Sequence, residues 1–331
     1  MKKLFAMTAL GACALFSTSA VLAAEAGKNL QEVTYLLPAP KTLPSFAPWL
    51  IAEKEGYFAD EGLKVNFVTG KGGVDVAKQI GAGNAVIGGA IGDTPIIVRA
   101  NGIPVKAVAV LGAGSLTLIA SHADKPINKP ADLKGKTISV MAYTDTTYYA
   151  LLGTMRKAGL TREDANIQAA GPAGVWQLFS SGKTDAMAGV PDWVVSARTA
   201  GTKVDLMPAN ELFDSMAQAI LASDESIKNN PELIQKMVRA TLKGMTLIMK
   251  DTDKAVASYV EANPAFKGKE GEVRQIFDLF NQYVYANQQV PGQMNVDRLA
   301  KVQDFYVSEG VVSKASKLED LYTNQFVGAG Q

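Results

Sequence analysis

The segment 142–149, which reads Ala-Tyr-Thr-Asp-Thr-Thr-Tyr-Tyr, gathers hydroxyls, a carboxylate and aromatic rings more densely than any other part of the chain. Such side chains can hydrogen-bond a small polar molecule and stack on its planar part. Thr144 or Asp145 is equally suited to cap a following helix, and both interpretations remain open. The candidate ligand contacts from this segment are Thr144, Thr146, Thr147 and Tyr148.

Two glycine-bearing loops, at 70–74 and 171–175, stand at matching positions in a repeated strand-helix unit. Glycine lets the backbone approach a ligand, and the first amides of a helix lack partners and can donate to an acceptor group. Taken singly, each glycine serves turn geometry just as well. Their recurrence in both halves favours a shared cleft, with Gly72, Gly73 and Gly174 as backbone contacts.

Two aspartates and three tryptophans also lie near predicted helix starts. Asp93 and Asp192 occupy equivalent positions, where each either caps a helix or binds an amine or ring nitrogen of a ligand. Trp49, Trp176 and Trp193 either stack on a flat ligand or pack in the core. The candidate set also includes Phe46 and Thr94, which lie in the predicted strand-end loops at 38–46 and 90–94, and Ser115, which lies in the predicted hinge.

The usual catalytic constellations are missing from the sequence. His122 is the only histidine, and Cys13, the only cysteine, precedes the predicted mature chain. Ser-His, Cys-His and zinc sites therefore cannot be assembled, and no spacing suggests a paired-carboxylate hydrolase. With 33 basic against 32 acidic side chains and no basic patch, nucleic acid is not an expected partner. We predict a protein that is not an enzyme and has no catalytic residue, metal or cofactor.

Strands alternating with helices predict an α/β fold of two Rossmann-like lobes. The expected first lobe comprises 24–114 plus 214–331, with a helix at 94–100 and C-terminal helices at 232–250, 253–262, 271–286 and 296–309. The second comprises 115–213, with strands at 137–141, 166–169, 185–189 and 204–207. Crossings near 113–116 and 208–213 would form a hinge. In open α/β sheets ligands bind beyond the carboxyl ends of the strands, which selects the loops named above. His122 is expected in a solvated loop.

The N-terminus predicts export. Residues 1–23 have a basic start, an apolar run and small residues at a cleavage site after Ala23, as in a signal peptide. A membrane anchor is the first alternative. The second is lipidation of Cys13, which lies in a lipobox-like Leu-Gly-Ala-Cys sequence. We expect a periplasmic monomer.

Several short motifs resemble one known family. They are Phe-Ala-Pro at 46–48, Gly-Tyr-Phe-Ala-Asp-Glu-Gly-Leu at 56–63, Gly-Ile-Pro-Val at 102–105, Asp-Leu-Lys-Gly-Lys at 132–136, Gly-Lys-Thr-Asp-Ala at 182–186 and Asp-Leu-Tyr-Thr-Asn at 320–324. Together they are similar to the solute-binding proteins of ABC importers for nitrate, sulfonates and taurine, and to binders of thiamine pyrimidine precursors. The run at 56–63 is the most specific element.

The resemblance implies a type II periplasmic-binding-protein fold whose two lobes, joined by a two-crossing hinge, close on a small-molecule solute. The protein would then dock on an ABC-transporter permease at the inner membrane. Sulfonate, aromatic acid, pyrimidine-like and nitrate-like solutes remain open, and the aromatic side chains favour an organic one. The alternatives are an enzyme on the same scaffold that acts on a small aromatic or pyrimidine compound, and a sensor subunit. Yeast-type enzymes of this group use a cysteine-rich motif that is absent here.

Overall fold

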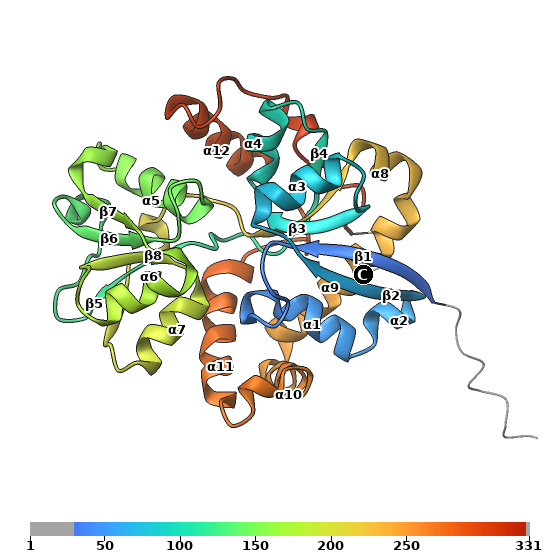
Figure 1. The fold of residues 1–331 in the computed structure, drawn as a ribbon, viewed down its shortest axis with the longest axis horizontal. Coiled ribbons are helices and arrows are strands. Elements are labelled where there is room, and N and C mark those ends of the chain that lie inside the picture. Colours follow the sequence, from blue (N-terminus) through green and yellow to red (C-terminus); the bar gives the residue numbers. More distant parts are fainter. Residues whose placement is uncertain (1–29, 329–331) are drawn as a thin grey trace, which may run out of the picture.

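The computed structural model describes residues 30–328 and shows two lobes, each built around one five-stranded sheet (Figure 1). The predicted signal peptide at 1–23 lies outside the described residues. None of the helices within 30–328 is long and apolar enough to cross a membrane. The two lobes lie side by side, and the C-terminal helices run along and between them.

The first lobe has the strand order β2-β1-β3-β10-β4, with β10 antiparallel to both of its neighbours. Its strands are β1 (Gln31–Leu37), β2 (Leu63–Thr69), β3 (Ile87–Ile91), β4 (Val105–Val110) and β10 (Gln218–Ser223). Its helices are α1 (Ala47–Lys54), α2 (Tyr57–Asp60), α3 (Gly73–Gly81) and α4 (Thr94–Ala100). Figure 1 shows α3 on one face of this sheet and α1 on the other. The inner strands are therefore apolar on both faces.

The second lobe repeats the plan with the order β7-β6-β8-β5-β9. Its strands are β5 (Leu118–His122), β6 (Thr137–Val140), β7 (Asn166–Ala169), β8 (Ala186–Gly189) and β9 (Val204–Leu206). Its helices are α5 (Thr146–Arg156), α6 (Gly171–Ser180) and α7 (Pro191–Thr199). In the first sheet the antiparallel strand β10 lies between β3 and β4, and in the second sheet the antiparallel strand β5 lies between β8 and β9. The predicted two-lobed α/β fold is confirmed.

The chain crosses between the sheets twice, from β4 to β5 and from β9 back to β10. Each crossing leads into the antiparallel strand of the sheet that it enters. The sequence analysis missed β5, because its counterpart in the first lobe is β10, which comes from a distant part of the chain. The solvated-loop interpretation of His122 is therefore wrong. His122 ends β5, its ring lies 4.4 Å from that of Phe179, and its Nε2 is 3.2 Å from the Thr184 carbonyl oxygen.

The C-terminal helices are α8 (Asp224–Asn229), α9 (Pro231–Lys250), α10 (Thr252–Ala262), α11 (Glu270–Leu279) and α12 (Val296–Ser308). A π-helical segment, Phe280–Tyr285, continues α11. The short 3-10 helices are Pro44–Phe46, Pro130–Leu133, Arg162–Asp164, Ala209–Glu211, Pro264–Phe266 and Leu318–Asp320. Helix α9 packs on α1 and α10 in the first lobe, whereas α11 also packs on α7 of the second. The tail thus contacts both lobes.

The π-helical segment holds the first crossing at very close range. A side chain at Gly112 or Gly114 would overlap the carbonyl oxygens of Val284 and Tyr283 respectively. The amide of Gly114 donates to the Val284 carbonyl at 2.9 Å. π-Helical turns are often found at functional sites, and this one packs directly against residues 112–114 of the first crossing.

We predict that Gly114→Ala destabilises the protein by about 2–3 kcal/mol, because the added methyl group would meet backbone that cannot move aside cheaply. Gly271→Ala, where nothing lies within 4 Å of the new methyl group, is the matched control and should be neutral or slightly stabilising. Urea unfolding of the two variants measures the difference. Equal stability of both variants would contradict the close packing at Gly114.

Candidate functional site

The two lobes touch where the carboxyl ends of their parallel strands meet. Ser45 follows β1 in the first lobe, and Asp192 follows β8 in the second. The Ser45 hydroxyl lies 2.8 Å from each carboxylate oxygen of Asp192, and the Ser45 amide donates to Oδ2 at 3.1 Å. We call this contact region between the strand ends the seam. It is the edge at which the sequence predicted a ligand site.

Asp192 is buried in this contact. Loss of hydration raises its pKa to about 6, and the two donors of Ser45 oppose the rise. Asp192 is the second residue of α7, after the N-cap residue Val190, so its carboxylate does not cap the helix. The capping interpretation is therefore wrong for Asp192, which holds the opposite lobe instead.

Asp93 precedes α4 and makes no capping hydrogen bond either. Its Oδ2 accepts a hydrogen bond from the Tyr306 hydroxyl of α12 at 2.8 Å, while its buried Oδ1 has no partner among residues 30–328. Burial raises the pKa of Asp93 to about 6, and the negative charge of Asp145 adds to the rise. A buried carboxylate oxygen without a donor is uncommon in a folded protein.

Asp145 caps α5, as one of the two interpretations expected. It accepts hydrogen bonds from the amide of Thr147 at 2.9 Å and from the Thr147 hydroxyl at 2.5 Å. Its pKa is raised by burial, which these hydrogen bonds offset in part. Of the other predicted contacts here, Thr144 is exposed, Thr146 is half-buried and Tyr148 is buried.

A row of aromatic rings runs from the second lobe across to α12 and the second crossing. Neighbouring centroids in this row are 4.7–6.1 Å apart, and two of the rings, those of Tyr149 on α5 and Tyr306 on α12, lie at 5.4 Å. The members, in spatial order, are Tyr143, Tyr148, Tyr149, Tyr306, Phe305 and Phe213. Only Tyr148 was in the predicted site. We call this set the aromatic row.

The predicted glycine contacts differ in what their backbone can offer. Gly72, at φ 91°, already donates its amide to the Pro38 carbonyl at 3.1 Å. Gly73 begins α3 and sits against Ala90 and the buried Thr94, where a larger residue would be crowded. Gly174 is the fourth residue of α6. Backbone amides that far into a helix ordinarily bond within it, so Gly73 is the better placed donor.

The three tryptophans fall into two environments. Trp49 is 1% exposed and packs on Tyr35 and Phe46 in the core of the first lobe. Phe46 is buried there as well, so these two predicted contacts hold the core together. Trp176 and Trp193 are half-buried in the second lobe, and Trp193 lies against Gly189 at the end of β8.

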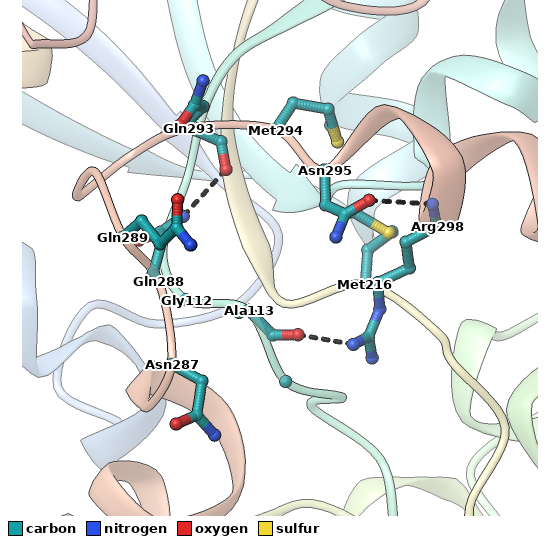
Figure 2. A pocket seen from close by; sticks show the side chains of 11 residues that line it. Gly112, Ala113, Met216, Asn287, Gln288, Gln289, Gln293, Met294, Asn295 and Arg298 are labelled. Atoms are coloured by element: carbon teal, nitrogen blue, oxygen red, sulfur yellow. Dashed lines mark hydrogen bonds between the residues drawn. The ribbon is translucent and has the colours of Figure 1, made fainter.

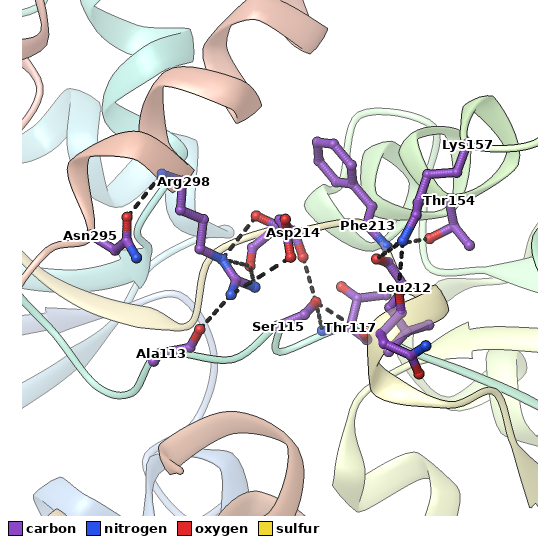
Figure 3. A network of polar contacts seen from close by, with 12 residues as sticks. Ala113, Ser115, Thr117, Thr154, Lys157, Leu212, Phe213, Asp214, Asn295 and Arg298 are labelled. Atoms are coloured by element: carbon purple, nitrogen blue, oxygen red, sulfur yellow. Dashed lines mark hydrogen bonds and ion pairs between the residues drawn. The ribbon is translucent and has the colours of Figure 1, made fainter. Parts of the chain in front are cut away.

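Ser115 lies in the hinge, where its hydroxyl is 2.5 Å from that of Ser215 and bonds the Thr117 carbonyl at 3.0 Å (Figure 3). This pair joins the first crossing to the second. Arg298 of α12 reinforces the junction, because its guanidinium donates to the carbonyls of Ala113, Asp214 and Ser215. Ser115 and Ser215 are both buried.

A cavity of about 340 Å³ adjoins this junction (Figure 2). It is lined by the backbone of 112–114 and by Met216, Met294, Arg298 and a group of carboxamides, Asn287, Gln288, Gln289, Gln293 and Asn295. A second cavity, of about 400 Å³, lies between α7, β9 and α11. Within 30–328 no cluster of His, Cys, Asp or Glu is arranged to hold a metal ion.

Several residues of the site escaped the sequence analysis, among them Ser45, Tyr149, Arg298 and Tyr306. Tyr149 was visible as part of the polar and aromatic segment at 142–149. The helical periodicity of 296–309 predicted α12, yet nothing in that pattern showed that its Arg298 and Tyr306 reach the hinge and the seam. Their roles depend on contacts with residues far away in the chain.

The chain is similar in sequence both to a binding protein and to enzymes. It is 26% identical to the riboflavin-binding protein RibY of Chloroflexus aurantiacus over 94% of this chain and 90% of that protein. It is 24% identical to a 4-amino-5-hydroxymethyl-2-methylpyrimidine phosphate synthase of Aspergillus parasiticus, over 90% and 88% of the two chains.

Among solved structures, the periplasmic aliphatic sulphonate binding protein SsuA from Escherichia coli matches with a TM-score of 0.70 at 16% identity, over 92% of this chain and 95% of that one. This likeness confirms the periplasmic-binding-protein fold. The family model described as NMT1/THI5 like matches residues 43–255. The chain is therefore a member of the NMT1/THI5-like family.

Proposed function

We propose that this protein binds a small organic solute between its lobes and delivers it to an ABC-transporter permease at the inner membrane. The observation that carries the proposal is the seam, where polar strand ends from both lobes meet and leave a buried carboxylate oxygen of Asp93 unpaired. A riboflavin-binding relative and the fold of a periplasmic sulphonate-binding protein support it. The periplasmic sulphonate-binding protein also supports export to the periplasm.

The hinge supplies the motion that such a function needs. Two crossings joined at Ser115 and Ser215 form a narrow connection about which two rigid lobes can rotate. A solute that contacts both lobes binds the closed form more tightly than the open form, and this difference in affinity shifts the equilibrium towards closure. The contact between Ser45 and Asp192 adds to the stability of the closed form.

An enzyme on the same scaffold is the second candidate, because a pyrimidine phosphate synthase is among the relatives. His122, the only histidine, ends a strand with its ring against Phe179, away from the seam residues. A receptor returns its ligand intact, whereas an enzyme releases a product. Mass spectrometry after incubation with the solute distinguishes the two.

The direct test is a thermal-shift screen of the purified protein against sulfonates, aromatic acids, amines and pyrimidines, followed by mass spectrometry of the solute. We expect one class to raise the melting temperature and to be recovered unchanged. At one hundred times its Kd, such a solute stabilises the folded state by about 2.7 kcal/mol. Chemical conversion of the solute would favour the enzyme instead.

Removing the interlobe hydroxyl should weaken solute binding. In Ser45→Ala, Asp192 keeps only the amide donor and is left buried with an unfulfilled acceptor, so the closed form loses about 1–2 kcal/mol. We expect solute affinity to fall about 5- to 30-fold by calorimetry. Ser181→Ala, at an exposed serine bonded only within its own lobe, should leave affinity unchanged. Equal affinities of the two variants would remove Ser45 from the closure mechanism.

Burial of Asp192 also predicts a pH dependence of stability. Its pKa of about 6 lies above the value near 4 that an unfolded chain would have, so the folded state takes up this proton first as pH falls. The folded state therefore gains stability from Asp192 between about pH 7 and pH 5. In Asp192→Asn this gain should be absent, so its stability relative to wild type should fall across the interval. Urea unfolding at both pH values measures the difference, and a constant difference would contradict the assignment.

A further inference from the structure

The Oδ1 oxygen of Asp93 is a buried hydrogen-bond acceptor for which the described part of the chain supplies no well-aligned donor. Asp93 is fully buried, and one of its two carboxylate oxygens accepts a hydrogen bond from the Tyr306 hydroxyl, while Oδ1 has no well-aligned donor among residues 30–328 beyond the nearby amide of Asp93 itself. Leaving a buried acceptor without a donor costs about 1–3 kcal/mol, and more when the acceptor is charged. A donor supplied from outside the chain would recover that free energy.

The surrounding charges do not neutralise Asp93. Asp145, from the second lobe, faces it with a negative charge, and this effect on Asp93 exceeds the positive effect of Arg298. The guanidinium of Arg298 is engaged with backbone carbonyls of both crossings. Closing the lobes therefore brings the two carboxylates close to each other, and the positive charge of Arg298 affects Asp93 less than the negative charge of Asp145 does. The electrostatic field at this point favours a positive group.

The aromatic row supplies the second half of a recognition site. The rings of Tyr149, from the second lobe, and Tyr306, from α12, lie 5.4 Å apart beside these carboxylates. Tyrosine faces attract cations and stack on planar groups. Because Tyr149 and Asp145 belong to one lobe and Asp93 to the other, a solute that contacts all of them would bind only when the lobes are closed.

Building on the solute-binding function proposed above, we propose that the solute carries a protonated amine or a ring N–H that donates to the free oxygen of Asp93, next to a planar part held by Tyr149 and Tyr306. This assigns the site to amines and nitrogen heterocycles rather than to sulfonates or carboxylates. Asp145 contributes long-range attraction, and Tyr306 positions Asp93 through its hydroxyl.

The test uses aromatic compounds of matched shape as probes, namely benzylamine, benzyl alcohol, benzoate and benzenesulfonate with their two-ring analogues, in thermal-shift and calorimetric titrations. We expect the amines alone to bind. Asp93→Asn should weaken the best amine by about tenfold or more, since it removes a charged acceptor. Asp304→Asn, at an exposed carboxylate on the same helix as Tyr306, is the matched control.

The pH profile of the wild-type protein provides a second measurement that needs no variant. The groups facing Asp93 are Tyr306 and Arg298 of α12 and Asp145 of the second lobe, and its own pKa is about 6. Amine affinity should therefore fall at least about fivefold between pH 7.5 and pH 5 as Asp93 takes up a proton. Affinity that does not change over this range would overturn the proposal.

The outcomes separate this inference from the function on which it rests. Binding of the sulfonates or carboxylates without the amines would overturn the inference and leave solute binding intact. Failure of every probe, together with no small molecule retained by the protein in native mass spectrometry, would contradict the proposed function itself.

Discussion

The guanidinium of Arg298 is the interaction on which the arrangement of the two lobes depends. It donates to carbonyl groups of both crossings, while the hydroxyl pair of Ser115 and Ser215 links the same two segments. Burial lowers the pKa of Arg298, but a guanidinium remains charged at any ordinary pH and so keeps its donors.

The hinge geometry set by Arg298 also explains why two carboxyl groups at the seam are buried with raised pKa values. Once the hinge fixes how the lobes approach, Asp192 has to lose water against Ser45, and Asp93, which Tyr306 of α12 already contacts, comes close to Asp145 of the second lobe. Burial raises the pKa of both carboxyl groups to about 6. Burying a carboxylate in this way costs stability in the empty protein. Under the proposed function, a solute that donates to Asp93 would recover part of that cost.

Local sequence patterns predicted most of the helices and strands, because the apolar periodicity of each element depends only on residues within that element. Apolar periodicity predicted α4 at its observed bounds and placed α9 and α12 to within a residue or two. Pattern analysis missed β5, whose pairing partners β8 and β9 lie far along the chain. It identified Asp93 and Asp192 as candidate contacts and Asp145 as a possible cap, yet it left capping and ligand binding open for the first two. A helix start attracts aspartate for more than one reason, and only the surroundings distinguish them.

The sequence by itself determined that the chain holds two copies of one strand-helix unit and that polar, glycine-rich and aromatic segments follow their strands. These properties depend on residues within a few positions of each other. Tertiary structure alone decided that Trp49 belongs to the core, that Ser45 meets Asp192, and that Tyr306 reaches Asp93. The last two of these contacts join residues 147 and 213 positions apart. Their free energy depends on which groups lose water together when distant segments pack, a quantity that no local pattern encodes.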